Sequence, residues 1–254
     1  MEESKMQLTT DVQWLDNLLP EGITIPSSTL ISGPGGTGKP LVGFAFLSAW
    51  LKAGGSVIAL PLQYPNPELT KSGMYKLYNM DLNDYSGRMV YIQFDPQADK
   101  TEKISEDMLK ANMVKPEVWD ETIAMAEKMV RQGGPGTLVF GAALNLLLFS
   151  QTYQNSILRK LEDTLKNDKS RTYLFAVSTS ALADKIKALE DAADNLMFTR
   201  IEKPGKLFFR IERMKEVEFS AQETQVPIGK EMLDELSNVA DSTRKTRIPE
   251  IRKI

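Results

Sequence analysis

A glycine-rich loop between two apolar runs constrains what this chain can fold into more than any other stretch. It follows a β-like run at residues 29–31 and precedes a strongly apolar, helix-like run at residues 41–50. Glycines let backbone N–H groups turn inward on a phosphate, and a helix N-terminus adds partial positive charge there. The order of strand, glycine loop and helix therefore predicts a phosphate-binding loop. Its candidate binding residues are Gly33, Pro34, Gly35, Gly36, Thr37, Gly38 and Lys39.

A second pattern lies immediately upstream of the loop. Residues 14–19 read Trp-Leu-Asp-Asn-Leu-Leu, and a glycine-bearing segment connects them to the apolar run before the loop. The two patterns at this spacing resemble the start of a RecA/KaiC-like P-loop ATPase core, of the compact single-domain type also found in archaea. The resemblance covers most of residues 11–220 and implies a RecA-like fold with an ATP site on the glycine loop.

Strand-like and helix-like segments alternate along the rest of the chain, and this pattern predicts an α/β fold. The alternation favours a doubly wound, mainly parallel sheet with right-handed crossovers. Two further runs, at residues 196–201 and 207–211, flank a Lys-Pro-Gly-Lys turn and predict a C-terminal antiparallel β-hairpin. The buried strands are expected at residues 57–60, 89–94, 137–140 and 173–177.

Length and apolar content predict one domain over residues 1–254. The chain has 254 residues, of which 42% are hydrophobic, and this is enough for one sizeable core. We expect the core at about residues 11–220, followed by a C-terminal helix and basic tail at residues 229–254. Residues 95–115 are polar and mixed, which favours an insertion or a surface loop.

The end of the chain, from residue 242, is polar and basic. Isoleucines interleave with the cations, and only Glu250 opposes them. This composition favours a solvated, disordered tail. The alternative is an arm that packs on a neighbouring subunit or adds to its sheet edge. The cations are Arg244, Lys245, Arg247, Arg252 and Lys253.

The composition excludes several kinds of chemistry. The chain has no cysteine and no histidine, which rules out disulfides, thiolate metal sites and histidine acid–base catalysis. Its 31 Lys and Arg stand against 34 Asp and Glu, and the net charge of −3 offers no general attraction to nucleic acid. No run approaches the roughly 18 apolar residues needed to cross a bilayer. We therefore expect a cytoplasmic protein that binds neither membrane nor nucleic acid.

Three positions depart from the working parts that the resemblance implies. A P-loop requires Ser or Thr after its lysine to bind Mg²⁺, but Pro40 has neither hydroxyl nor N–H and biases Lys39 away from helical geometry. Gly141 stands where a Mg²⁺-holding Asp would end the fourth strand. Gln63 stands near the water-activating acid after the second strand, and Glu68, the nearest carboxylate, suits the start of the next helix.

These losses predict a degenerate site with no catalytic residue, no metal ligand and little or no ATP hydrolysis. The glycines and Lys39 could still hold sulfate, phosphate, or ATP or ADP without Mg²⁺. KaiC-like ATPases also place a Lys-x-Arg pair where it reaches the nucleotide of a neighbouring subunit. Arg213 and Lys215 form a similar pair with the cations exchanged, which makes them a candidate trans-subunit finger. Ordinary alternation of charges on an exposed edge strand is the other interpretation.

Three functional hypotheses follow. The first is a non-hydrolytic scaffold or regulatory protein that binds a protein or peptide partner or self-associates. The second is an ATP-binding ATPase with a rearranged metal site, which requires a carboxylate such as Glu68 near Lys39. The third is a DNA-repair recombinase paralogue, which the mixed charges of residues 182–194 do not favour.

Overall fold

The structure, a computed structural model, describes residues 6–63, 67–202 and 205–254. A ten-stranded sheet organises the chain, in the order β12-β11-β10-β3-β9-β8-β4-β5-β7-β6. Neighbouring strands from β10 to β7 run parallel, whereas β11, β12 and β6 are antiparallel to their neighbours. The strands are β1 Met6–Leu8, β2 Ile23–Ile25, β3 Ser28–Ser32, β4 Ser56–Pro61, β5 Met89–Phe94, β6 Glu102–Ser105, β7 Met108–Ala111, β8 Thr137–Ala142, β9 Thr172–Ala176, β10 Asn195–Glu202, β11 Lys206–Arg213 and β12 Thr224–Gln225.

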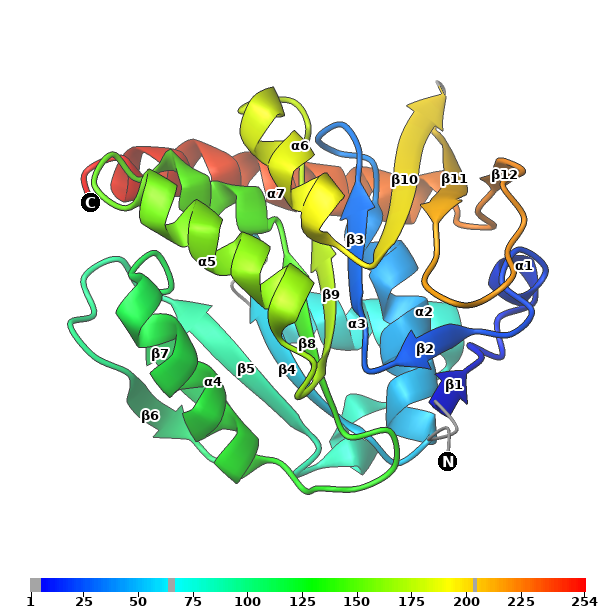
Figure 1. Ribbon diagram of the computed structural model, residues 1–254, viewed down its shortest axis with the longest axis horizontal. Coiled ribbons are helices and arrows are strands. Elements are labelled where there is room, and N and C mark those ends of the chain that lie inside the picture. Colours follow the sequence, from blue (N-terminus) through cyan, green and yellow to red (C-terminus); the bar gives the residue numbers. More distant parts are fainter. Residues whose placement is uncertain (1–5, 64–66, 203–204) are drawn as a thin grey trace.

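Helices cover both faces of this sheet (Figure 1). Side chains of α2 and α3 belong to one hydrophobic cluster, and those of α4, α5 and α6 belong to the cluster on the other face. The helices are α1 Gln13–Asp16, α2 Lys39–Lys52, α3 Pro67–Tyr78, α4 Pro116–Met129, α5 Gln154–Asn167, α6 Ala183–Ala192 and α7 Lys230–Ile251, with short 3-10 turns η1 Leu82–Tyr85 and η2 Leu144–Phe149. The predicted α/β class with a doubly wound, mainly parallel sheet is confirmed.

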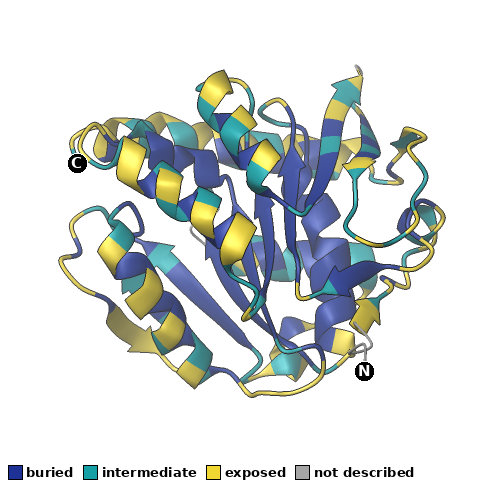
Figure 2. Ribbon diagram, viewed as in Figure 1, coloured by how far each residue is buried: buried dark blue, intermediate teal, exposed yellow. Residues whose placement is uncertain are grey.

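The central strands are buried on both faces, as their continuous apolar runs predict. Figure 2 shows them dark blue, while the outward sides of α4 and α5 are exposed. Successive residues of β4 alternate between the clusters: Val57 and Ala59 lie on one face, and Ile58 and Leu60 lie on the other. The strands therefore form the middle layer of a three-layer structure.

The predicted C-terminal hairpin is confirmed. Strands β10 and β11 pair antiparallel with Met197 opposite Ile211 and Thr199 opposite Phe209. These four side chains are buried, whereas the next residues along each strand point to the opposite face and are half-buried or exposed. Residues 203–204 of the turn lie outside the described residues.

The interpretation of residues 95–115 as an insertion or surface loop is wrong. Strands β6 and β7 extend the sheet there, and β7 pairs parallel with β5. Leu109 and Ala111 are fully buried in the same cluster as Trp119 of α4. Between them, Lys110 forms ion pairs with Glu102 at 2.9 Å and Asp95 at 3.8 Å. The sequence prediction failed here because the strand is short and half-buried. Its inward-facing residues are apolar, and the polar Lys110 lies between them.

The expectation of a disordered basic tail is also wrong. Helix α7 continues through the basic residues to Ile251. Its first half contributes Leu233 and Leu236 to one cluster, and its last turn contributes Ile251 to the other. It therefore crosses from one face of the sheet to the other, past the carboxyl ends of the central strands (Figure 1). This segment is ordered because its interleaved isoleucines pack against the hydrophobic core of the same chain.

Candidate functional site

The glycine loop connects β3 to α2, as the sequence predicts. Gly36 and Gly38 adopt left-handed conformations, with φ of 75° and 58°. A side chain at either position would be strained, so glycine is required for this turn. Helix α2 begins at Lys39, with Pro40 in its first turn. Proline is tolerated there because the first-turn N–H groups lack helical partners in any case.

The side chain of Lys39 folds back into the loop. Its Nζ donates to the carbonyl oxygen of Gly33 over 3.0 Å, to that of Pro34 over 2.5 Å, and to Thr37 Oγ1 over 3.1 Å. Burial lowers the pKa of this amine from 10.5 to about 7, because desolvation penalises the charged form. The lysine therefore occupies the loop itself and has a reduced charge at neutral pH.

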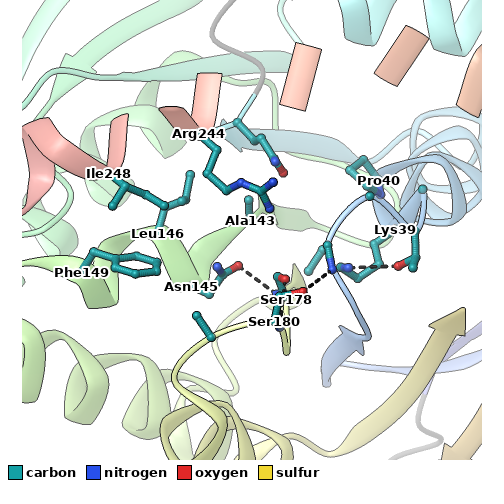
Figure 3. Close-up of a pocket in the computed structure, with 17 residues that line it drawn as sticks. Lys39, Pro40, Ala143, Asn145, Leu146, Phe149, Ser178, Ser180, Arg244 and Ile248 are labelled. Carbon is teal, nitrogen blue, oxygen red and sulfur yellow. Dashed lines mark hydrogen bonds between the residues drawn. The ribbon is translucent and has the colours of Figure 1, made fainter. Parts of the chain in front are cut away.

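A cavity of about 230 Å³ lies beside the loop (Figure 3). Its walls come from the carboxyl ends of β8 and β9, from η2 and from α7. Ser180 Oγ accepts from the Gly35 N–H over 2.9 Å. The polar lining outside the loop consists of Gln63, Asn145, Ser178, Ser180 and Arg244.

Two of these polar side chains brace the cavity wall. Asn145 Oδ1 accepts from the Ser178 N–H over 2.9 Å, which fixes the segment after β9. Gln63 Nε2 donates to the Ala240 carbonyl of α7 over 3.3 Å. The residue at the position of the expected water-activating acid thus holds the C-terminal helix.

The cavity contains no carboxylate among the described residues that line it. Within the described ranges there is also no group of three or more acidic side chains that could hold a metal ion. At Gly141 an added Cβ would lie 2.8 Å from Leu144 Cγ, so a side chain there requires Leu144 to move. Glu68 lies on α3 and pairs with Lys71 at 3.1 Å. Among the described residues, the structure places no acid in the cavity where the ATPase chemistry of the resemblance needs one.

Helix α7 forms one wall of the cavity, which the sequence analysis did not predict. Ser237 Oγ donates to the Gly36 carbonyl over 3.4 Å, and a Cβ on Gly38 would lie 2.8 Å from Leu233 Cδ2. Arg244, two turns further on, lines the cavity beside Gly35. Sequence reasoning missed Arg244 as a site residue. Its signal was the helical spacing that continues from Ala240 to Ile248 and Ile251.

Arg213 and Lys215, the candidate finger, bind within their own chain. Arg213 Nη2 donates to the carbonyls of Glu190 and Ala193 over 2.5 and 2.8 Å. Lys215 Nζ lies 3.4 Å from Asp194 Oδ1. The structure does not bring either residue to the loop cavity, and their role toward a second subunit stays a prediction.

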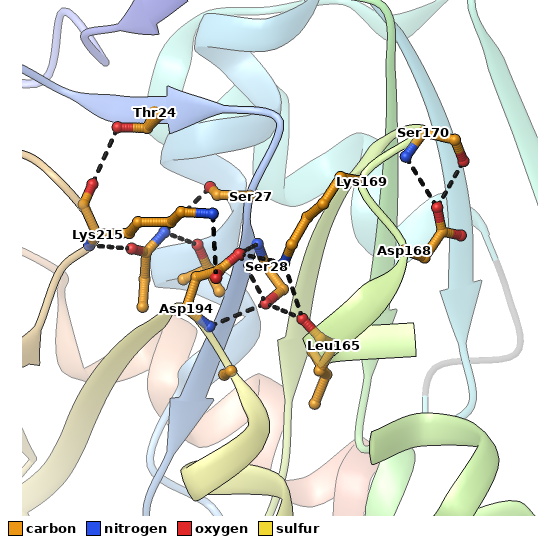
Figure 4. Close-up of polar contacts among 12 residues, drawn as sticks. Thr24, Ser27, Ser28, Leu165, Asp168, Lys169, Ser170, Asp194 and Lys215 are labelled. Atoms are coloured by element: carbon orange, nitrogen blue, oxygen red, sulfur yellow. Dashed lines mark hydrogen bonds and ion pairs between the residues drawn. The ribbon is translucent and has the colours of Figure 1, made fainter. Parts of the chain in front are cut away.

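Asp194 joins Lys215 to a polar network at the amino end of β3 (Figure 4). Its Oδ2 accepts from Lys169 Nζ over 2.6 Å and from the Ser28 N–H over 3.0 Å. Burial alone would raise the pKa of Asp194, but the hydrogen bonds outweigh it and hold the pKa below its usual value. Ser28 Oγ also donates to the Leu165 carbonyl over 2.6 Å. This network joins β3, α5 and the start of β10.

None of the helices in the described part of the chain is long and apolar enough to cross a membrane. The sheet order and the flanking helices define an α/β protein with a RecA-like fold, and a cavity lies beside its glycine loop. No protein-family model and no curated protein matches the sequence. Among solved structures, a KaiC-like protein from the hyperthermophilic archaeon Pyrococcus horikoshii OT3 matches with a TM-score of 0.66. The match has 14% sequence identity and covers 89% of this chain and 96% of that one, so the likeness is one of fold.

Proposed function

We propose that this chain is a non-hydrolytic regulatory or scaffold protein of the RecA/KaiC-like type that holds a phosphate-bearing ligand without metal. One observation carries the proposal: the lining of the loop cavity combines hydrogen-bond donors and cations with no carboxylate among the described residues. A carboxylate-free lining suits an anion and offers Mg²⁺ no protein anchor.

The absence of hydrolysis rests on three separated positions. Pro40 supplies no hydroxyl, Gly141 supplies no carboxylate, and the side chain of Gln63 bonds to α7. Each group would act with the others on the same metal and water. Losing groups that act as a unit leaves no proportionate remainder of activity. A single restored hydroxyl at position 40 would therefore create no ATPase.

Phosphate binding is supported by the loop backbone. The amides of Gly36, Thr37 and Gly38 donate to no acceptor among the described residues. These groups, together with the N-terminus of the 14-residue helix α2, favour an anion. The phosphates of ATP or ADP without Mg²⁺ are ligands of this chemistry. We place the protein in the cytoplasm, where such ligands are abundant.

The output of such a site is an interaction with a protein or peptide partner, or with a second copy of the chain. If the protein does not hydrolyse its ligand, it can exist in two states, with the cavity occupied or empty. A partner can distinguish these two states. The alternative, an ATPase with a rearranged metal site, requires a carboxylate beside Lys39, and Glu68 is engaged elsewhere on α3. A recombinase paralogue finds no support in the net charge of −3.

Calorimetric titration tests the proposal. ATP, ADP and inorganic phosphate are titrated with Mg²⁺ and with EDTA, and phosphate release from ATP is followed in parallel. We expect binding that does not need Mg²⁺, loss of binding in Lys39→Met, and no turnover. Lys52→Met, at the exposed end of the same helix, is the matched control. Mg²⁺-dependent turnover that disappears in Lys39→Met would refute the proposal.

A further inference from the structure

Arg244 brings a guanidinium to the glycine loop from far along the same chain. Its Nη1 lies 3.0 Å from the point that a Cβ on Gly35 would occupy. Helix α7 holds it there, because Leu233 packs on Gly38 and Ser237 bonds to the Gly36 carbonyl. The helix thus follows the loop over several turns, and Arg244 faces the cavity (Figure 3).

The guanidinium has donors to spare. Arg244 Nη2 donates to Asp241 Oδ1 over 2.6 Å, and this is an exposed i,i+3 pair on the same helix. Such pairs contribute little. A guanidinium carries five N–H donors in a planar fork that matches two oxygens of a phosphate. A phosphate in the cavity can therefore recruit Arg244 at small cost.

We propose that Arg244 is a direct ligand of a compact phosphate dianion, which it holds against the glycine loop while α7 is docked. The proposal rests on the proposed function, since it assigns the ligand class of the same cavity. The cavity of about 230 Å³ is below the roughly 300–1,000 Å³ of pockets that enclose drug-sized ligands. A phosphate group fits beneath the docked helix, whereas a whole nucleotide would extend beyond this cavity.

The state of α7 then depends on the ligand. Phosphate that bridges the loop and Arg244 stabilises the docked helix, whereas a nucleotide at the loop would compete with α7 for space. Coupling of this kind is reciprocal: whatever holds α7 down favours phosphate, and whatever releases it favours the larger ligand. The C-terminal helix is therefore a wall of the site, and its docking changes when a ligand binds.

Titration of inorganic phosphate in EDTA tests Arg244 directly. In Arg244→Gln we expect the Kd to rise about tenfold or more, because a charged hydrogen-bond pair is lost. In Asp241→Asn we expect the Kd to fall about twofold to fivefold, because the competing carboxylate is gone. Lys245→Gln removes the same charge from the adjacent, exposed position and should stay within about twofold of the unmodified protein.

Hydrogen exchange and the nucleotide titrations supply a second readout. Phosphate should slow amide exchange across α7 in the unmodified protein and not in Arg244→Gln, while ADP and ATP should bind more weakly than phosphate and speed that exchange. Equal phosphate affinity in Arg244→Gln and Lys245→Gln would overturn the role of Arg244 and leave the proposed function standing. If ATP or ADP bound more tightly than phosphate while the amides of α7 stayed protected from exchange, the role of Arg244 as a phosphate ligand under a docked helix would also be overturned, and the proposed function would still stand. Absence of binding by all three ligands would overturn both.

Discussion

The ammonium nitrogen of Lys39 lies 3.0 Å from the carbonyl oxygen of Gly33, the first residue of its own loop. The lysine that would reach an outer phosphate is thus bonded inward, where the pKa of its amine is about 7. The proposed phosphate ligand would draw this amine out of the loop, and its negative charge would favour the protonated form of the amine. The proposed ligand binding would therefore be linked to protonation of Lys39.

The pH dependence of stability should report the buried amine. The pKa of Lys39 is lowered in the folded state, so the unfolded state binds more protons between about pH 7 and 10. The free energy of unfolding should therefore rise with pH across this window, relative to Lys39→Met. Urea denaturation of both proteins at pH 7, 8 and 9 measures the difference. A constant difference would show that the amine keeps its ordinary pKa.

A carboxylate at position 141 should destabilise the fold and restore no activity. Gly141→Asp places a Cβ 2.8 Å from Leu144 Cγ and puts a new charge in a buried strand. We expect a loss of about 1–3 kcal/mol or more in the free energy of unfolding. Gly229→Asp is the control, because its surroundings are open and it is the N-cap of α7, where Asp is favourable. Equal stability of the two variants would contradict the packing at β8.

Arg213 should contribute to the stability of the isolated chain. In Arg213→Gln the carbonyls of Glu190 and Ala193 lose a charged donor, and we expect a cost of about 1–3 kcal/mol in thermal or urea unfolding. Arg210→Gln, on the outward side of the same strand, should cost about 0.5 kcal/mol or less. An unchanged stability in Arg213→Gln, with altered self-association, would instead favour the trans-subunit finger.

Asp194 should make the chain sensitive to acid. The pKa of this carboxyl is below its usual value, so its stabilisation is present above about pH 4 and is lost as the pH falls through the folded-state pKa. Asp194→Asn should cost about 1–3 kcal/mol at pH 7, and the difference should shrink toward pH 3. Asp191→Asn removes an exposed i,i+4 partner of Lys187 and should have little effect at any pH. A difference that stays the same at pH 3 would assign the effect to packing instead of charge.

The glycine loop and the alternating sheet pattern could be predicted because they depend on neighbours in the sequence. Gly36 and Gly38 are glycines because the turn requires left-handed backbone, and the apolar run of β4 is continuous because both of its faces are covered. The absence of an acid at position 141 was equally visible, although its steric reason, the side chain of Leu144, was not.

By itself, then, the sequence determined the fold class, the place of the glycine loop and the residue types that the candidate site lacks. Only the tertiary structure decided that residues 95–115 complete the sheet, that the basic C-terminus is a helix, and that Arg244 faces the loop. The physical reason is distance along the chain. Leu109 is buried in the same cluster as Trp119, and Arg244 lies beside Gly35, through packing between segments far apart in the sequence. A polar segment becomes ordered when the few apolar side chains within it find a remote core.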